Sequence, residues 1–115
     1  MSITRHESAA RMSQAVNYNG VAYLAGQVAS GASVTEQTRG ILAKVEHLLE
    51  LAGTDKSRLL SATIWLTSMD DFAEMNAVWD AWVDSDNSPA RACVESPRLA
   101  TPEFQVEIMV MAATA

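Results

Sequence analysis

The residues best suited to chemistry lie in two short alternating stretches near the C-terminal end of the sequence. In Ala90–Glu95, the alternation puts Arg91 and Cys93 on the same face of a predicted strand. In Phe104–Ala112, the apolar residues take one face and leave Glu107 on the other. If these two strands are neighbours, Arg91, Cys93 and Glu107 converge on the side of the sheet that no helix covers. A guanidinium there suits a small carboxylate, and a nearby carboxylate can position a water molecule or transfer protons.

The same charged residues also have a purely structural explanation. Arg91 and Glu107 could form an ion pair that only fixes an interface, and spacing alone does not decide between that pair and a ligand site. Other chemical signatures are weak. His6 and His47 have no acidic or cysteine partner at metal-ligand spacing, and the sequence has no glycine-rich phosphate loop. We therefore expect no metal site.

Six strands and two helices must position these residues, and the hydrophobic pattern predicts all of them. The predicted strands are Ile3–His6, Ala15–Tyr18, Val21–Val28, Leu59–Thr67, Ala90–Glu95 and Phe104–Ala112. The predicted helices are Val34–Ala52 and Asp70–Val83. The order is β-β-β-α-β-α-β-β, which indicates an α+β class with one sheet and both helices crossing over one of its faces.

Local signals mark the ends of several of these elements. Ser33 and Glu36 form a capping box at the start of the first helix, and Gly53 stands where a left-handed stop is expected. The dipeptide Asn19-Gly20 predicts a tight hairpin turn. The residues that we expect on the helix side of the fourth strand are Leu60, Ala62, Ile64 and Leu66.

One face of the predicted sheet has no helix to cover it, and its residues are not uniformly polar. Trp65, Met109 and Met111 all fall on this face. A monomer that exposed such a patch would risk association, so we expect an oligomer that buries it. In the alternative arrangement, Trp65 packs under the Gly26–Ser33 loop of its own chain.

Composition excludes several classes of protein. The 115 residues suit a single domain, 1–115, and carry eight Lys and Arg against fourteen Asp and Glu, a net charge of −6. That charge disfavours nucleic-acid and anionic-membrane partners, which attract basic surfaces. The single cysteine cannot form an internal disulfide, and the first residues have no apolar signal-peptide core. We expect a cytoplasmic protein without a membrane span.

Several segments together resemble the RidA/YjgF superfamily, and most closely its YoaB-like branch. These segments are Ser88–Glu95, Val106–Ile108, Tyr23–Val28, Leu51–Gly53, Asp71–Asn76 and Trp79–Trp82. The resemblance implies a chorismate-mutase-like (YjgF-type) α+β fold, assembled as a homotrimer whose sheets line a central barrel with ligand clefts between subunits. It also implies hydrolysis of reactive enamine or imine intermediates, such as small 2-imino acids, to 2-keto acids and ammonia. The resemblance further implies that neither a metal nor an organic cofactor takes part.

The resemblance also implies roles for single residues. Arg91 matches the arginine that binds the substrate carboxylate, and Glu107 matches the acidic residue that orients the hydrolytic water. Cys93 matches a cysteine beside the same cleft, although a small buried thiol without a covalent role is the favoured interpretation. Backbone groups of Gly26, Gln27 and Ala92 are expected at the rim of the cleft.

Two positions depart from the family pattern. Met12 stands where the archetype has a tyrosine, and Ala25 stands where it has a serine before the Gly-Gln pair. Each replacement removes a hydroxyl that would contact a ligand. The sequence is therefore compatible with a changed substrate or slower hydrolysis, and also with a non-catalytic trimeric protein that binds small carboxylates or 2-keto acids. Some relatives are described as endoribonucleases, and the acidic composition argues against that activity here.

Overall fold

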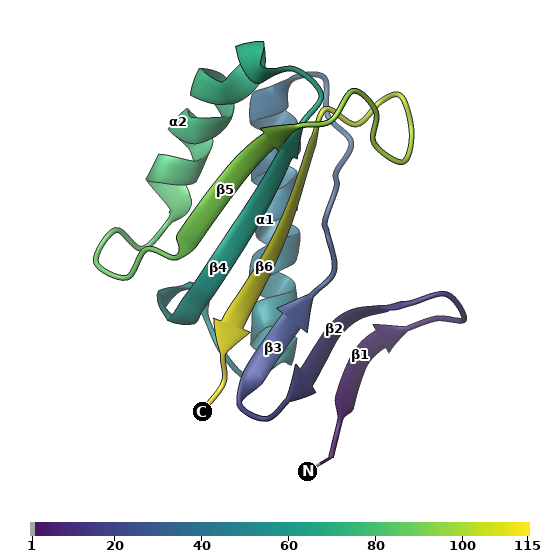
Figure 1. Ribbon diagram of the computed structural model, residues 1–115, viewed down its shortest axis with the longest axis vertical. Coiled ribbons are helices and arrows are strands. Elements are labelled where there is room, and N and C mark those ends of the chain that lie inside the picture. The colour runs from purple at the N-terminus through teal and green to yellow at the C-terminus, as the bar shows by residue number, and fades with distance from the viewer. Residues whose placement is uncertain (1) are drawn as a thin grey trace.

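Six strands form one sheet, and two helices lie on one of its sides (Figure 1). The computed structural model describes residues 2–115. The strands are β1 (Thr4–Ser8), β2 (Ser13–Tyr18), β3 (Val21–Leu24), β4 (Leu59–Leu66), β5 (Ala90–Glu95) and β6 (Val106–Ala113). The helices are α1 (Val34–Leu51) and α2 (Phe72–Trp82), and short 3-10 turns, Lys56–Arg58 and Met69–Asp71, precede β4 and α2. The predicted α+β class and the predicted element order are confirmed.

The strand order in the sheet is β1-β2-β3-β6-β4-β5, so β6 lies between β3 and β4. β4 and β5 are parallel and joined through α2, whereas every other neighbouring pair is antiparallel. Asn19 and Gly20 form the tight turn between β2 and β3 with positive φ angles of 53° and 78°, as the dipeptide predicts. The free edges of the sheet are β1 and β5.

Helix α1 covers the sheet because one of its stripes is apolar. The buried apolar residues of this stripe are Val34, Ile41, Leu42, Val45, Leu48 and Leu49. The Ser33 hydroxyl accepts a hydrogen bond from the Glu36 amide at 3.1 Å, and Gly53, just after the helix, has a φ of 81°. A Cβ at Gly40 would lie 2.9 Å from the Ala29 Cβ, so glycine allows the close approach of this segment. The Ser33 cap and the Gly53 stop are confirmed, but the capping box is only half formed, because the Glu36 carboxylate accepts from the Ala32 amide at 2.7 Å.

Helix α2 begins later than the sequence predicts. Asp70 and Asp71, expected in its first turn, lie in the preceding 3-10 turn, where the Ser68 hydroxyl accepts a hydrogen bond from the Asp70 amide at 3.2 Å. Such a local bond favours a tight turn over a helical start. Met75 and Trp79 are the buried residues of α2, and they pack the helix against the core.

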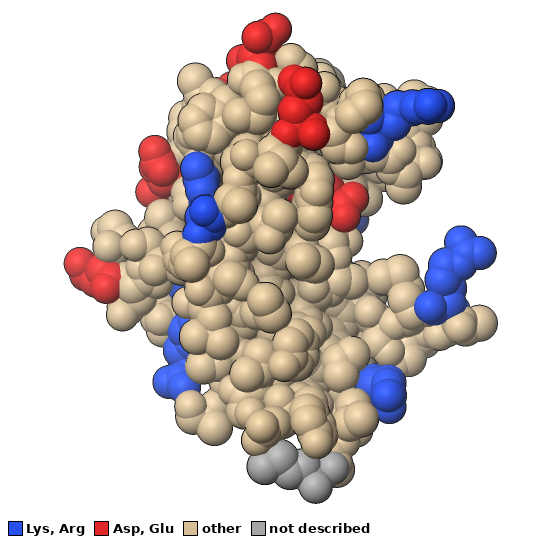
Figure 2. All heavy atoms as spheres, in the orientation of Figure 1, with Lys and Arg blue, Asp and Glu red and all other residues tan. Residues whose placement is uncertain are grey.

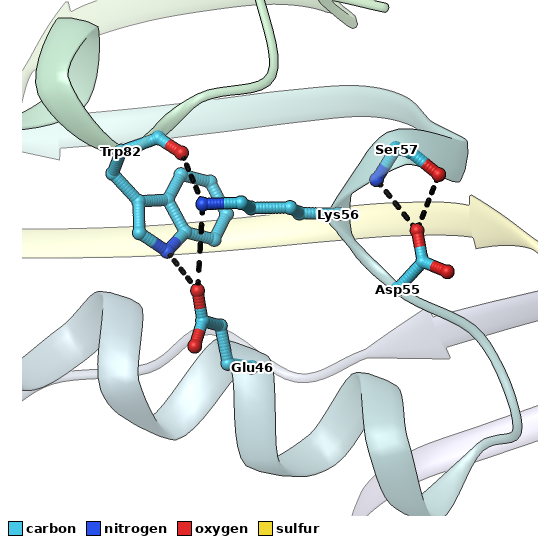
Figure 3. A network of polar contacts seen from close by, with 5 residues as sticks. All are labelled: Glu46, Asp55, Lys56, Ser57 and Trp82. Carbon is cyan, nitrogen blue, oxygen red and sulfur yellow. Dashed lines mark hydrogen bonds and ion pairs between the residues drawn. The ribbon is translucent and has the colours of Figure 1, made fainter.

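A polar cluster at the end of α2 joins both helices to the turn before β4 (Figure 3). The Lys56 ammonium lies 5.3 Å from the centre of the Trp82 ring and donates to the Trp82 carbonyl oxygen at 2.7 Å. The Trp82 indole N–H donates to the Glu46 carboxylate at 2.7 Å, and Lys56 lies 3.7 Å from the same carboxylate. Because Glu46 belongs to α1, the cluster fixes the end of α2 against α1.

The start of β4 departs from strict alternation. A bulge opposite β6, between Leu59 and Ser61, turns Leu59 inward and Leu60 outward. Leu59 is 6% exposed and Leu60 is 48% exposed, so the prediction that Leu60 lies on the buried face is wrong. An extra residue in one strand shifts the side chains on one side of it to the opposite face. The later members of the series are buried as predicted: Ala62, Ile64 and Leu66.

β3 is shorter than predicted because its regular pairing with β2 and β6 is interrupted near Gly26. The Ala25 amide still donates to the Gln14 carbonyl of β2 at 2.8 Å. Two residues later, Gln27 exchanges both backbone hydrogen bonds with Ile108 of β6. Gly26 therefore lies at a break in the strand, between the regular pairings of β3 and the isolated Gln27–Ile108 bridge.

β6 begins later than predicted because a helix side chain bonds the backbone just before it. Gln37 of α1 is 1% exposed. Its side-chain oxygen accepts from the Gln105 backbone N–H at 2.9 Å, and its side-chain nitrogen donates to the carbonyls of Gly31 and Glu103 at 3.1 and 2.9 Å. One buried glutamine thus ties α1 to the loop before β6, and its polar atoms are satisfied without water.

The helix-free face of the sheet carries large apolar side chains, and the prediction is confirmed for Trp65, Met109 and Met111, whereas Val94 was expected on the opposite face. The large apolar side chains of this face are Tyr23, Trp65, Val94, Met109 and Met111. Trp65 is half-buried and has Val94 and Glu107 as its register partners on the two adjacent strands. Figure 2 looks onto this face and shows an uncharged surface over β3, β6 and the lower part of β4. The charged side chains in this view lie mostly toward its margins.

Candidate functional site

Arg91 lies on the edge strand β5, and its side chain points to the helix side of the sheet. Its register partner is Ala62, which is buried under the helices. One terminal guanidinium nitrogen, Nη1, donates to the Asn76 side-chain oxygen at 2.8 Å. The guanidinium carbon lies 5.5 Å from the ring centre of Trp79 and 6.0 Å from that of Phe72. Three side chains of α2 therefore surround this arginine.

Glu107 lies on the opposite, helix-free face, where its register partner is Trp65. Its carboxylate rests against the backbone at Gly26, and a Cβ added there would lie 2.9 Å from the carboxylate carbon. Glycine at this position leaves the space that the Glu107 side chain fills. Burial raises the pKa of the Glu107 carboxyl. A carboxyl group with a raised pKa is better suited to exchange protons at neutral pH.

The prediction that Arg91, Cys93 and Glu107 converge on the helix-free side is wrong. β5 and β6 are not neighbours, because β4 lies between them. Arg91 and Cys93 pair with Ala62 and Ile64 of β4, which are buried on the helix side. Alternation shows which residues share a face, but it does not show which face the helices cover. Within residues 2–115 of one chain, Arg91 and Glu107 form no ion pair.

Cys93 has the surroundings of a small core residue. It is half-buried and packs against the hydrophobic core. Burial raises the pKa of its thiol, and the positive charge of Arg91 only partly offsets this effect. A thiol that stays protonated is a poor nucleophile. Ala92 points the other way, because its register partner is Thr63 on the helix-free face.

Met12 and Gly26 line one hollow of 410 Å³ between the β1–β2 hairpin and α1. Met12 is 43% exposed. Ala25, next to Gly26, contributes a carbonyl that accepts from the Gln27 side chain at 3.0 Å, and its own side chain is only a methyl group. The residues that line the hollow are Glu7, Met12, Gln14, Gly26, Gln27, Val28, Lys44, His47 and Leu48. Neither Met12 nor Ala25 brings a hydroxyl to this region.

The structure divides the predicted site residues into two groups. The first group, Arg91 and Cys93, lies on the helix side of β5. The second group lies around Gly26 and consists of Met12, Ala25, Gly26 and Glu107. Met12 lines the same hollow as Gly26, Ala25 precedes Gly26 in the chain, and the Glu107 carboxylate lies against the Gly26 backbone. Ala92 belongs to neither group, since it faces the helix-free side of β5. Among residues 2–115, no three His, Cys, Asp or Glu side chains cluster so as to hold a metal ion.

Asn76 is a polar contact of Arg91 that the sequence reasoning missed. Phe72, Asn76 and Trp79 follow the spacing of one helix face, and that spacing could have grouped them. The missing information was that β5 presents an arginine to this face. Gln27 is expected only for its backbone groups at the rim of the cleft, yet its buried side chain also donates to the Gln14 side chain at 2.9 Å. The sequence does not indicate this bond, because glutamine is mostly exposed in proteins.

Comparison with known proteins shows the family to which these features belong. The sequence profile of the family described as Endoribonuclease L-PSP matches residues 2–114. The RutC family protein YoaB of Escherichia coli K12 is 40% identical over 114 residues, covering 98% of this chain and 99% of YoaB. The chain belongs to the RidA/YjgF superfamily, in its YoaB-like branch. A RutC family protein of Haemophilus ducreyi is 45% identical over 113 residues, which are 96% of each chain.

Solved structures of the RidA/YjgF superfamily share the whole fold. The crystal structure of a YjgF-family member from Neisseria meningitidis has a TM-score of 0.97 at 46% identity, covering 100% of this chain and 97% of that one. A member from Mycobacterium tuberculosis has a TM-score of 0.90 at 29% identity, covering 97% and 99%. Within residues 2–115, this YoaB-like chain has no helix long and apolar enough to cross a membrane.

Proposed function

We propose that the protein hydrolyses small 2-imino acids and their enamine tautomers to 2-keto acids and ammonia. The observation that carries this proposal is the open guanidinium of Arg91, which donates only to a neutral amide within residues 2–115. A guanidinium without an internal carboxylate is free to bind the carboxylate of a ligand. Glu107, with its raised pKa, is the group assigned to the water and the protons.

The proposed site is shared between two subunits. Arg91 and Glu107 lie on opposite faces of one sheet and on strands about 10 Å apart, since β4 separates β5 from β6. A 2-imino acid is too small to reach both residues of the same chain. A second copy that covers the apolar helix-free face can bring its own Arg91 to the first chain's Glu107. We propose a homotrimer, the assembly that the family resemblance implies.

The proposed chemistry needs one water molecule and a group that accepts and returns a proton. The water oxygen attacks the carbon of the protonated imine while the Glu107 carboxylate takes a proton from the water, which yields a neutral carbinolamine. The Glu107 carboxyl then returns the proton to the nitrogen, and the C–N bond breaks. As the C=O bond forms, the hydroxyl proton passes to the departing ammonia, which leaves as ammonium. Arg91 binds the substrate carboxylate throughout.

The remaining site residues have supporting parts in this proposal. Cys93 shapes the cleft beside Arg91 and takes no covalent role, in keeping with a thiol whose pKa is raised. Backbone groups of Gly26 and Ala92 line the rim. No metal or organic cofactor takes part in the proposed reaction. We also propose that residues 1–115 form a single RidA/YjgF-like domain and that the protein is cytoplasmic.

A non-catalytic protein that binds 2-keto acids is the second candidate. The observation that favours it is the absence of a hydroxyl at Met12 and Ala25. Both residues lie near Gly26, against which the Glu107 carboxylate rests. The family profile that matches is described as Endoribonuclease L-PSP. We do not carry this activity over, because a net charge of −6 opposes RNA binding.

Turnover of an imine made in solution tests the first candidate. An amino-acid oxidase generates 2-iminopropionate from alanine, and loss of the imine is followed with and without the protein. We expect the wild type to speed hydrolysis and Arg91→Ala to lower kcat/KM about 30- to 1,000-fold, because a charged hydrogen-bonded contact is lost. Arg39→Ala is the matched control, since Arg39 is exposed on α1 and its removal changes the net charge equally.

The outcomes separate the two candidates. Hydrolysis by the wild type no faster than in buffer overturns catalysis with this substrate. If pyruvate then still raises the melting temperature of the wild type and not that of Arg91→Ala, the binding protein is the correct alternative. RNA incubated with the same preparation should stay intact. Degradation of the RNA by the wild type and not by Arg91→Ala would show that the protein is an endoribonuclease.

A further inference from the structure

One face of α2 is built around the Arg91 side chain. Phe72, Asn76 and Trp79 lie at positions i, i+4 and i+7, which place three side chains along the same side of a helix. All three contact the guanidinium of Arg91, one through a hydrogen bond and two through their rings. Trp79 is 5% exposed and Phe72 is 37% exposed, so one ring is anchored in the core and the other borders the solvent.

The contact with Asn76 leaves the positive charge of Arg91 uncompensated. The chain has fourteen acidic residues, yet within residues 2–115 its ion pairs are His47 with Glu7 and Lys56 with Glu46. Arg91 instead donates to the oxygen of a neutral amide. A carboxylate in the place of this amide would occupy the arginine and compete with any anionic ligand.

The contact also selects which edge of the guanidinium stays open. Nη1 is bonded to Asn76, whereas Nε and Nη2 have no hydrogen-bond partner within residues 2–115. These two nitrogens form one edge of the fork, and that edge can donate two parallel hydrogen bonds to a carboxylate. The rings of Phe72 and Trp79 lie within reach of cation–π attraction and restrict rotation of the long side chain.

We propose that Asn76, Phe72 and Trp79 are positioning residues that hold Arg91 with its charge free and its Nε–Nη2 edge turned to the ligand carboxylate. The inference rests on the proposed function, because it concerns the same arginine. It adds a requirement that position 76 be a neutral hydrogen-bond acceptor. Asn76 thereby sets the affinity for 2-keto and 2-imino acids without touching them.

Substitution of the amide by its isosteric acid tests this requirement. Asn76→Asp keeps the size and the acceptor and adds a carboxylate beside Arg91. We expect its dissociation constant for pyruvate, measured by calorimetry, to rise at least about tenfold, because the new charge competes with the ligand. KM for 2-iminopropionate should rise by a similar factor with little change in kcat, while the melting temperature stays the same or rises.

Two further variants and a control complete the test. Asn76→Ala should raise the dissociation constant about three- to tenfold by leaving the guanidinium unoriented. Phe72→Leu, at an exposed position, should raise it about two- to fivefold by removing the aromatic ring. Asn19→Asp adds the same charge in the turn between β2 and β3, which tolerates Asp-Gly, and should leave pyruvate binding unchanged.

The result that overturns the inference is wild-type affinity for pyruvate in both Asn76→Asp and Asn76→Ala. A loss of affinity that follows a loss of melting temperature in all variants would also overturn it, since that pattern indicates a structural role. If the wild type binds pyruvate and Asn76→Asp does not, the inference stands even where no imine is turned over. In that case only the catalytic part of the proposed function fails. A wild type that binds no pyruvate overturns both.

Discussion

Arg91 and Glu107 are the two charged residues assigned to one ligand, and the fold holds them by different means. Arg91 sits on an edge strand, exposed, and relies on side chains of α2 for its orientation. Glu107 sits on β6, inside the sheet, and relies on the absence of a side chain at Gly26. The Arg91 charge meets a neutral partner at the surface, whereas burial shifts the protonation of the Glu107 carboxyl.

This difference assigns separate tasks to the two regions. A guanidinium is always charged, so its surroundings can tune only its direction and its freedom from competing anions. A carboxyl group titrates, so its surroundings can tune when it carries a proton. The α2–β5 region is therefore suited to binding, and the β6–Gly26 region to proton transfer. Variants of each region should therefore affect different properties of the protein.

Mixed assemblies should give the largest effect. Arg91→Ala and Glu107→Gln should each be nearly inactive when prepared alone. If every cleft takes its arginine from one subunit and its glutamate from another, random assembly of equal amounts should restore about a quarter of the wild-type activity. Unfolding and refolding the two variants together, followed by the imine assay, measures this. Activity no higher than the average of the separate variants would mean that both residues act from one chain.

Gly26→Ala should have a smaller effect, and mainly on turnover. The added Cβ overlaps the Glu107 carboxylate, which must rotate away, so we expect kcat to fall about tenfold through misplacement of the proton acceptor. The free energy of unfolding should fall by less than about 1 kcal/mol, because the displaced atoms are the end of a flexible side chain.

Gly53→Ala is the matched control for this substitution. Gly53 has a φ of 81° and open space around its Cβ position, so alanine there strains the backbone and touches nothing. It should lower the free energy of unfolding by about 1 kcal/mol and leave kcat unchanged. Loss of turnover in Gly53→Ala and not in Gly26→Ala would contradict the role given to the strand break.

The smallest expected effect is on the pH dependence of stability. Because the pKa of the Glu107 carboxyl is raised above its ordinary value of 4.5, the folded state disfavours the charged form. The stability linked to this group is fully present below pH 4.5 and is lost as the pH rises through the raised pKa. Glu107→Gln should therefore match the wild type at pH 4 and exceed it at pH 8, by less than about 1 kcal/mol since the group is partly solvated.

Denaturant unfolding at pH 4, 6 and 8, at one fixed protein concentration, measures this difference. A fixed concentration is needed because subunit association contributes to apparent stability. A difference between Glu107→Gln and the wild type that is the same at all three pH values would exclude burial of the carboxyl as its cause.

The sequence predicts the elements of this fold far better than their arrangement. The capping pair Ser33 and Glu36 and the turn Asn19-Gly20 act within a few residues, so their outcome is visible in the local sequence. The order of strands depends on long-range pairing, and nothing near Glu107 indicates that β4 lies between β5 and β6. The register of β5 against β4 is equally absent from the local sequence, and this register places Arg91 on the helix side.

In the candidate site, too, the sequence does not show which residues are partners across the fold. Arg91 and Glu107 stand out by charge and by family resemblance, and the sequence is enough to propose them as site residues. Asn76 and Gln37 are uncharged amides whose importance comes from their partners, Arg91 in one case and the loop before β6 in the other. The bulge that exposes Leu60 likewise depends on pairing with β6, because the local alternation continues through it.

The central place of β6 also governs how the molecule reaches its folded state. Its residues 106–113 pair with both β3 and β4, so the two halves of the sheet have no hydrogen bonds to each other until this segment has been synthesised. Before that moment, β3 and β4 present open edges, and such edges can pair with other chains. The strand that joins the β-meander of residues 4–24 to the β4–α2–β5 unit is thus the last in the sequence, and its pairing with β3 bridges a long stretch of chain, which is typical of slow steps in folding.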